Sequence, residues 1–195
     1  MKVRRQSKII GALMLTGVVG LGGVASAATA PSSHARTSQS VQAHVVKTKR
    51  IAFKGSYSGN IAMLWNSSSV TATSVTGKGT GTLLGASKVS GKGSGNATAT
   101  CNPFSGTGTL SGGGSVIRFR VVSSASQQAC AAGQSAPTTV ALKGIATVIG
   151  GTGKYAGATG KLAISGSFSI QSTTAGTSES DAFTATLHGS LTVKG

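Results

Sequence analysis

The chain has 195 residues, with 18 Lys or Arg but only two Asp or Glu, and its formal net charge is +16 at pH 7. The way in which these bases are distributed argues against nucleic acid as the partner, because nucleic-acid-binding proteins usually concentrate their bases and interleave them with aromatic residues. The bases here are spread thinly, aromatic residues make up 4% of the chain, and no constellation of residues indicates a particular reaction.

The N-terminus has the organisation of a secretory signal peptide. Four bases within the first eight residues precede an uncharged stretch over 9–24, which ends in the small-residue pattern Ala25-Ser26-Ala27. We predict that residues 1–27 are a signal peptide cleaved after Ala27. A retained membrane anchor is the alternative, but it needs about 20 apolar residues, and the stretch here is shorter and rich in glycine. The mature protein is then expected to be secreted or associated with the cell wall, with no transmembrane anchor.

The mature chain begins with a polar segment and continues as one domain. Residues 28–44 are small and polar, contain one Pro and no aromatic residue, and show no periodicity. We predict a disordered leader over 28–44 and a single folded domain over 45–195.

The domain is predicted to be all-β. Short stretches rich in Val, Ile, Thr, Phe and Tyr alternate with Gly/Ser clusters, a pattern typical of an antiparallel β-barrel or sandwich. The expected eight or nine strands cover residues 45–54, 57–65, 69–77, 80–90, 94–101, 114–123, 138–149, 160–171 and 181–193. Within them, the sequence Val75-Thr-Gly-Lys-Gly-Thr-Gly81 recurs as Val89-Ser-Gly-Lys-Gly-Ser-Gly95, either as a structural repeat or as low-complexity drift.

Cys101 and Cys130 are the two cysteines of the chain. An even number of cysteines in an exported protein favours a disulfide bond, and no C-x-x-C spacing indicates a reactive pair. The residues around Cys130, over 125–136, have a helical composition, but Gly133 and Pro137 restrict any helix to a turn or two.

The segment Ile149–Gly160 carries the most specific pattern in the chain. We expect its residues to form a tight turn and a cap over the end of a core, with structural roles for Gly150, Gly151, Gly153, Tyr155, Gly157, Ala158 and Gly160. It does not read as a phosphate-binding loop, because Lys154 is followed by Tyr155 instead of Ser or Thr, and the next residues alternate like a strand.

The last predicted strand is the clearest, and it begins beside both acids of the chain. Over 181–193 one side is mainly apolar and the other mainly hydroxylated, as in a half-buried strand. Glu179 and Asp181 have the parity of the apolar side. They are the candidate catalytic residues, because two carboxylates in one pocket shift each other's pKa. The alternative is that both acids face solvent.

The glycine-rich segment resembles the Gly-Gly-Thr-Gly-x-[Phe/Tyr]-x-Gly-Ala-x-Gly signature of the allene oxide cyclase and dirigent barrel superfamily. The resemblance covers residues 138–193 closely and the earlier part by strand count. It implies a calycin-like, eight-stranded antiparallel β-barrel with a central cavity, often in a homo-oligomer, and we expect this fold, with a β-sandwich as the alternative. Members place acidic residues in the pocket, for which this chain has only Glu179 and Asp181.

We therefore expect a secreted, non-catalytic barrel that binds a small apolar ligand or associates with the cell envelope. One alternative is a dirigent-like or cyclase-like isomerase that uses the cavity. Another is a surface protein that binds an anionic envelope polymer through the cluster Lys47, Lys49, Arg50 and Lys54. No cofactor or metal is expected, because the three histidines, His34, His44 and His188, do not form a cluster with other ligands.

Overall fold

The computed structural model describes residues 47–195, which form nine β-strands and one short 3-10 helix. The predicted signal peptide with its cleavage at Ala27 and the predicted leader over 28–44 lie outside these residues. No helix within 47–195 is long and apolar enough to cross a membrane. The elements in chain order are β1 (Thr48–Trp65), β2 (Ser69–Gly81), β3 (Gly85–Asn96), β4 (Cys101–Gly112), β5 (Ser115–Val121), β6 (Gln128–Ala131), β7 (Thr138–Thr152), η1 (Gly153–Tyr155), β8 (Thr159–Ile170) and β9 (Ser178–Lys194).

The strands form a closed antiparallel barrel, as predicted. Hydrogen bonding follows the order β3-β2-β1-β9-β8-β7-β5-β4, and a further pairing of β3 with β4 closes the ring. The short β6 pairs with β4 and β7 beyond the end of β5, so β5 and β6 together occupy one of eight positions. Closure confirms the eight-stranded barrel over the alternative sandwich.

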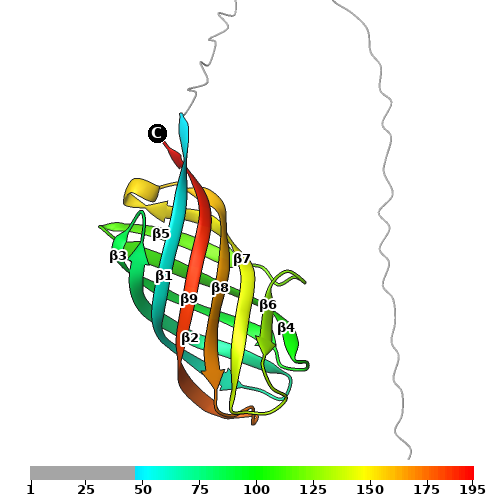
Figure 1. Ribbon diagram of the computed structural model, residues 1–195. Coiled ribbons are helices and arrows are strands. Elements are labelled where there is room, and N and C mark those ends of the chain that lie inside the picture. The colour runs from blue at the N-terminus through cyan, green and yellow to red at the C-terminus, as the bar shows by residue number, and fades with distance from the viewer. Residues whose placement is uncertain (1–46) are drawn as a thin grey trace, which may run out of the picture. The chain divides into compact units, whose positions relative to one another are not determined.

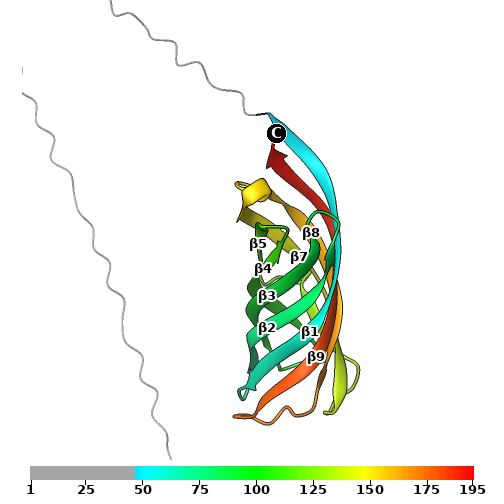
Figure 2. The ribbon, with the colours of Figure 1, turned by 90° about the vertical axis from the view of Figure 1, so that its left-hand side faces the viewer.

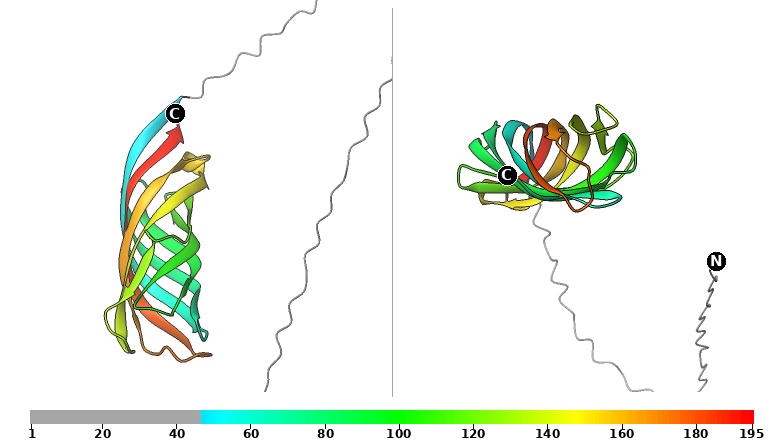
Figure 3. Two further views of the ribbon diagram at one scale, coloured as in Figure 1. Left: turned by 90° about the vertical axis from the view of Figure 1, so that its right-hand side faces the viewer. Right: turned by 90° about the horizontal axis from the view of Figure 1, so that it is seen from below.

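The barrel is flattened into two curved walls (Figures 1 and 3). Strands β1, β9, β8 and β7 form one wall, here called the β9 wall. Strands β2, β3, β4 and β5 form the opposite one, here called the β3 wall. Side chains alternate between the interior and the outer surface along each strand, as strand geometry requires.

Several strand boundaries differ from the sequence prediction. The predicted strands 45–54 and 57–65 are one continuous strand, β1, and most of β4 was predicted as a connection. The predicted helical turn around Cys130 is wrong, because these residues form β6.

The errors at β3 and β4 arise from glycines that lie within strands. Gly93 of β3 is opposite Gly106 of β4, and a Cβ atom at Gly93 would lie 2.6 Å from the carbonyl oxygen of Ser105. Glycine is therefore needed here for the close approach of two strands and does not mark a turn.

The core fills the half of the barrel nearest η1. All the large side chains that are completely buried lie in this half, namely Phe53, Leu110, Ile117, Leu162 and Leu191. Register places them at similar heights, with Phe53 and Leu162 both opposite Gly189 and Leu110 opposite Ile117.

The segment that carries the glycine signature closes this end of the barrel. Tyr155 of η1 is buried, and its hydroxyl donates a 2.5 Å hydrogen bond to the carbonyl oxygen of Leu83 in the β2–β3 turn. Ala158 is completely buried beside it. Positive φ angles occur at Gly150, Gly153, Gly157 and Gly160, whereas a Cβ at Gly151 would lie 2.3 Å from the Val116 carbonyl oxygen. This end is here called the plugged end.

Candidate binding cavity

The half of the barrel away from η1 contains an apolar cavity of about 210 Å³. Four phenylalanines line it, one each from β4, β5, β8 and β9: Phe104, Phe119, Phe168 and Phe183. Aliphatic side chains complete the lining, among them Ile61, Val75, Val89 and Leu187. These residues occupy inward positions of their strands, so the cavity is the unfilled part of the barrel core.

The cavity continues into an open mouth. A second hollow of about 330 Å³ shares Met63, Asn102 and Phe168 with the cavity wall, and it lies among the loops that join β1 to β2, β3 to β4, β6 to β7 and β8 to β9. These loops gather at the end opposite η1 (Figure 1). A small molecule can therefore reach the cavity from this end, whereas Tyr155 and its neighbours cover the other.

The Glu179 carboxylate links two segments of the chain at one side of the mouth. Its Oε1 accepts a 2.6 Å hydrogen bond from the indole Nε1 of Trp65, and its Oε2 accepts bonds from the backbone amides of Gln171 and Ser172 at 2.8 and 3.2 Å. The backbone of Trp65 also pairs with Thr177 and Gly176. The Glu179 carboxylate thus joins the end of β1 to the β8–β9 loop, and both of its oxygens have structural partners.

Asp181 lies two residues further along β9 and also faces inward. Its Oδ1 accepts a 3.4 Å hydrogen bond from the side-chain amide of Gln171, while its Oδ2 is buried without a hydrogen-bond partner among residues 47–195. The structure therefore brings Glu179 and Asp181 to the same side of β9. However, neither residue is among those that line the cavity or the mouth.

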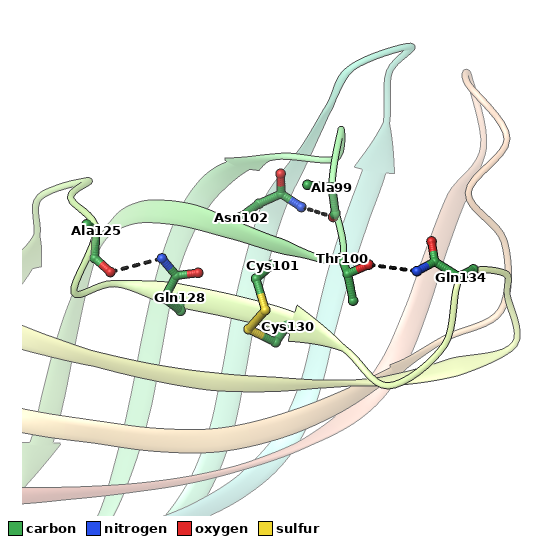
Figure 4. The surroundings of a disulfide bond; sticks show 8 residues. All are labelled: Ala99, Thr100, Cys101, Asn102, Ala125, Gln128, Cys130 and Gln134. Carbon is green, nitrogen blue, oxygen red and sulfur yellow. Dashed lines mark hydrogen bonds between the residues drawn. A yellow bond between two sulfur atoms is a disulfide. The ribbon is translucent and has the colours of Figure 1, made fainter.

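The predicted disulfide is present and holds the wall beside the cavity (Figure 4). Cys101 of β4 is directly opposite Cys130 of β6, with 4.0 Å between their Cα atoms. The neighbouring Ala129 faces inward and lines both the cavity and the mouth. The disulfide therefore fixes β6, the short strand that covers the cavity where β5 has ended.

Hydrogen bonds around the disulfide order the adjacent loops (Figure 4). Asn102 is buried, and its Nδ2 donates to the carbonyl oxygen of Ala99. The side chain of Gln134 donates to the hydroxyl of Thr100 at 3.0 Å, which links the β6–β7 loop to the β3–β4 loop. Sequence reasoning did not identify Asn102 or the four phenylalanines, although their inward parity is visible once the strands are placed.

The other predicted residues lie outside the cavity. Lys49, Arg50 and Lys54 are exposed on or near β1 toward the plugged end, as is Lys47 just before the strand, and Arg50 Nε donates a 2.9 Å hydrogen bond to the Ser190 hydroxyl. His188 is exposed on the outer surface of β9. In the part of the chain that the structure describes, no three His, Cys, Asp or Glu residues gather to form a metal site.

Comparison of the chain with protein-family models, with curated proteins and with solved structures finds no match. Function is therefore inferred from the cavity, its mouth and the outer surface of the barrel.

Proposed function

We propose that the protein is a secreted, non-catalytic barrel that binds a small apolar ligand in the phenylalanine-lined cavity. The observation that carries this proposal is the contrast between the two halves of one barrel, because one half is filled with side chains and the other is hollow beside an open mouth. An apolar cavity of roughly 150 Å³ holds benzene, so the larger cavity here is suited to a ligand of about ten non-hydrogen atoms.

The charges around the cavity favour a neutral ligand. Among the described residues, Lys92 is the one basic residue in the lining, and its side chain is exposed on the outer surface of β3. The loops of the mouth contain no Lys or Arg, and the carboxylates nearby belong to Glu179 and Asp181. A buried anionic group would have no cationic partner, which makes its transfer from water costly. Asn102 is the buried polar side chain that a neutral ligand would meet.

Secretion and the barrel family remain part of the proposal. The disulfide supports export, because disulfides form and persist in oxidising compartments. The closed eight-stranded barrel and the glycine segment at its plugged end support the resemblance to the allene oxide cyclase and dirigent superfamily. An isomerase activity is not favoured, since the two carboxylates do not line the cavity and Glu179 has structural partners on both oxygens.

The experiment is a calorimetric titration of the mature protein with p-xylene, 4-methylbenzamide and 4-methylbenzoate. We expect the two neutral compounds to bind and the carboxylate to bind at least tenfold more weakly, because its charge would be buried unpaired. Failure of both neutral compounds to bind, with the protein folded, would contradict the proposal.

A matched pair of variants locates the binding site. Ala129 faces the cavity, whereas Ala141 is exposed on the outer surface of neighbouring β7. Ala129→Leu adds three carbon atoms to the cavity and should weaken p-xylene binding at least tenfold. Ala141→Leu makes the same chemical change outside and should leave binding unchanged. Equal affinities of the two variants would place the ligand elsewhere.

A further inference from the structure

The outer surface of the β3 wall carries bases and no acid. Five exposed or half-exposed bases point outward from it: Lys78, Lys88, Lys92, Arg118 and Arg120. Both acids of the whole chain lie on the inward side of β9, near the start of that strand. The bases of the β3 wall therefore have no carboxylate beside them in the barrel surface.

Strand register gathers these bases into rows across the wall. Lys78 of β2 is directly opposite Lys88 of β3, and this like-charge pair destabilises the sheet when no anion is bound. Further along, Lys92 and Arg120 flank the same residue, Thr107. Strands β2, β3 and β4 run side by side here (Figure 2). Bases that are distant in the sequence thus form one continuous stripe, which an anion would stabilise.

Two shallow hollows on this wall combine cations with hydroxyl groups. One, of about 510 Å³, contains Lys78, Lys88 and Ser111. The other, of about 430 Å³, contains Lys92 and Arg118 together with several hydroxyls, including the hydrogen-bonded pair Ser90 and Thr109. Lysine, arginine and hydroxyl groups donate hydrogen bonds to anionic oxygens, and bonds from the charged donors are the stronger ones. Each hollow can therefore receive an anionic group.

The outer surface of the described barrel lacks the aromatic side chains on which the bases of single-stranded nucleic acids stack. Every aromatic residue within 47–195 is buried in the core or packed against it. Single-stranded nucleic acids are held by stacking of bases on aromatic side chains as well as by charge, and stacking is excluded here. The wall offers charge and hydroxyl groups without an exposed aromatic side chain.

We propose that the β3 wall binds a linear polyanion whose repeating units each carry an anionic oxygen group and no stacking base. Such a polymer would lie across the two hollows on the outer surface. The strands that form these hollows also form the cavity wall, but the basic side chains point outward, away from the cavity. Each proposal can therefore fail without the other.

The proposal is tested with the mature protein on immobilised long-chain polyphosphate and on polygalacturonate, which distinguish phosphate from carboxylate repeats, and on single-stranded DNA. We expect binding to at least one of the first two polymers at 0.05 M salt, a steep decline as salt screens the charges, and weaker binding to DNA. No binding to either polymer, or tighter binding to DNA, would overturn the proposal.

The deciding variant removes three bases of the stripe: Lys88→Ser, Lys92→Ser and Arg118→Ser. We expect its affinity for the preferred polymer to fall at least tenfold at 0.1 M salt and its salt dependence to flatten. The control removes three exposed bases of the β9 wall: Lys54→Ser, Lys143→Ser and Lys161→Ser. Because both variants lose the same charge, the control should lose less than threefold, and equal losses would mean that net charge alone attracts the polymer.

A measurement on the unaltered protein covers the case in which a triple variant does not fold. Lysines are acetylated with and without bound polymer, and the modified sites are mapped by mass spectrometry. Protection should be confined to Lys78, Lys88 and Lys92. Equal protection of Lys54 and Lys143 would overturn the assignment to the β3 wall.

Discussion

Replacing both cysteines by serine, Cys101→Ser with Cys130→Ser, should destabilise the barrel by about 3.6 kcal/mol. The bond joins residues separated by 29 positions. The closure entropy of a loop of this length is roughly 12 cal/mol/K, which gives about 3.6 kcal/mol at 25 °C. Two serines avoid free thiols, and these positions are exposed or half-exposed, so the substitution leaves no cavity in the core.

Urea unfolding followed by tryptophan fluorescence measures the effect. Trp65 reports on the mouth because it is buried and bonded to Glu179. We expect the midpoint to fall and the dependence of the unfolding free energy on urea concentration to rise, because the unfolded chain without the cross-link exposes more surface. Chemical reduction of the unaltered protein is the control and should give the same loss. A loss below about 1 kcal/mol would refute the closure-entropy reasoning.

Hydrogen exchange separates the global effect from a local one. Strand β6 has four residues, and it is held by short pairings with β4 and β7 in addition to the disulfide. Without the disulfide, the amides of β6 should exchange through local opening, well before those of β9. Uniform protection across both strands would show that β6 does not depend on the bond.

Three further predictions concern single features of the barrel. Lys88→Ser should stabilise the protein by roughly 0.2–1 kcal/mol, measured by urea unfolding at low salt, because it removes the repulsion from Lys78. Glu179→Gln should destabilise it by about 1–3 kcal/mol in the same assay, because an amide cannot accept hydrogen bonds at both ends. Burial raises the pKa of both Tyr57 and Tyr155 above the ordinary 10.0, although the hydrogen bond to Ser87 lowers the pKa of Tyr57 in part. The unfolded chain releases these protons near pH 10 and the folded chain retains them, so the free energy of unfolding should fall as pH rises above 10. Thermal midpoints from pH 8 to 11 test this, and Tyr155→Phe should show a smaller decline.

The sequence predicted the barrel because strand alternation is a local property. In β9, apolar and hydroxylated residues alternate as far as Val193, and the burial of Phe183, Leu187 and Leu191 follows that pattern. The disulfide was predictable for a similar reason, since Cys101 and Cys130 have only each other as partners.

The repeated sequence acquires a physical meaning only in the folded hairpin. The two copies lie in β2 and β3, where Val75 is opposite Gly91 and Gly77 is opposite Val89. The valine of each copy thus lies opposite a glycine of the other copy, and only the strand register reveals this pairing. The same register places Lys78 opposite Lys88, so the basic stripe was hidden in the sequence for the same reason.

The cavity could not be predicted, because it depends on which inward side chains meet across the barrel. Phe53 and Phe104 are both inward-facing phenylalanines, yet the first is buried in the filled half and the second lines the hollow half. The two phenylalanines differ because the register of the eight paired strands places them at different heights along the barrel, and because Tyr155 plugs the end of the filled half.

The described chain enters and leaves the barrel at one place. Thr48 pairs with Lys194, and the amide of Gly195 donates a 2.8 Å hydrogen bond to the carbonyl oxygen of Lys47. A short linker between Gly195 and Lys47 would therefore permit circular permutation, with new ends in a loop of the mouth. Attachment of the barrel to a bead or to a carrier protein through either of these residues would point the mouth outward and leave it free to exchange molecules with the medium.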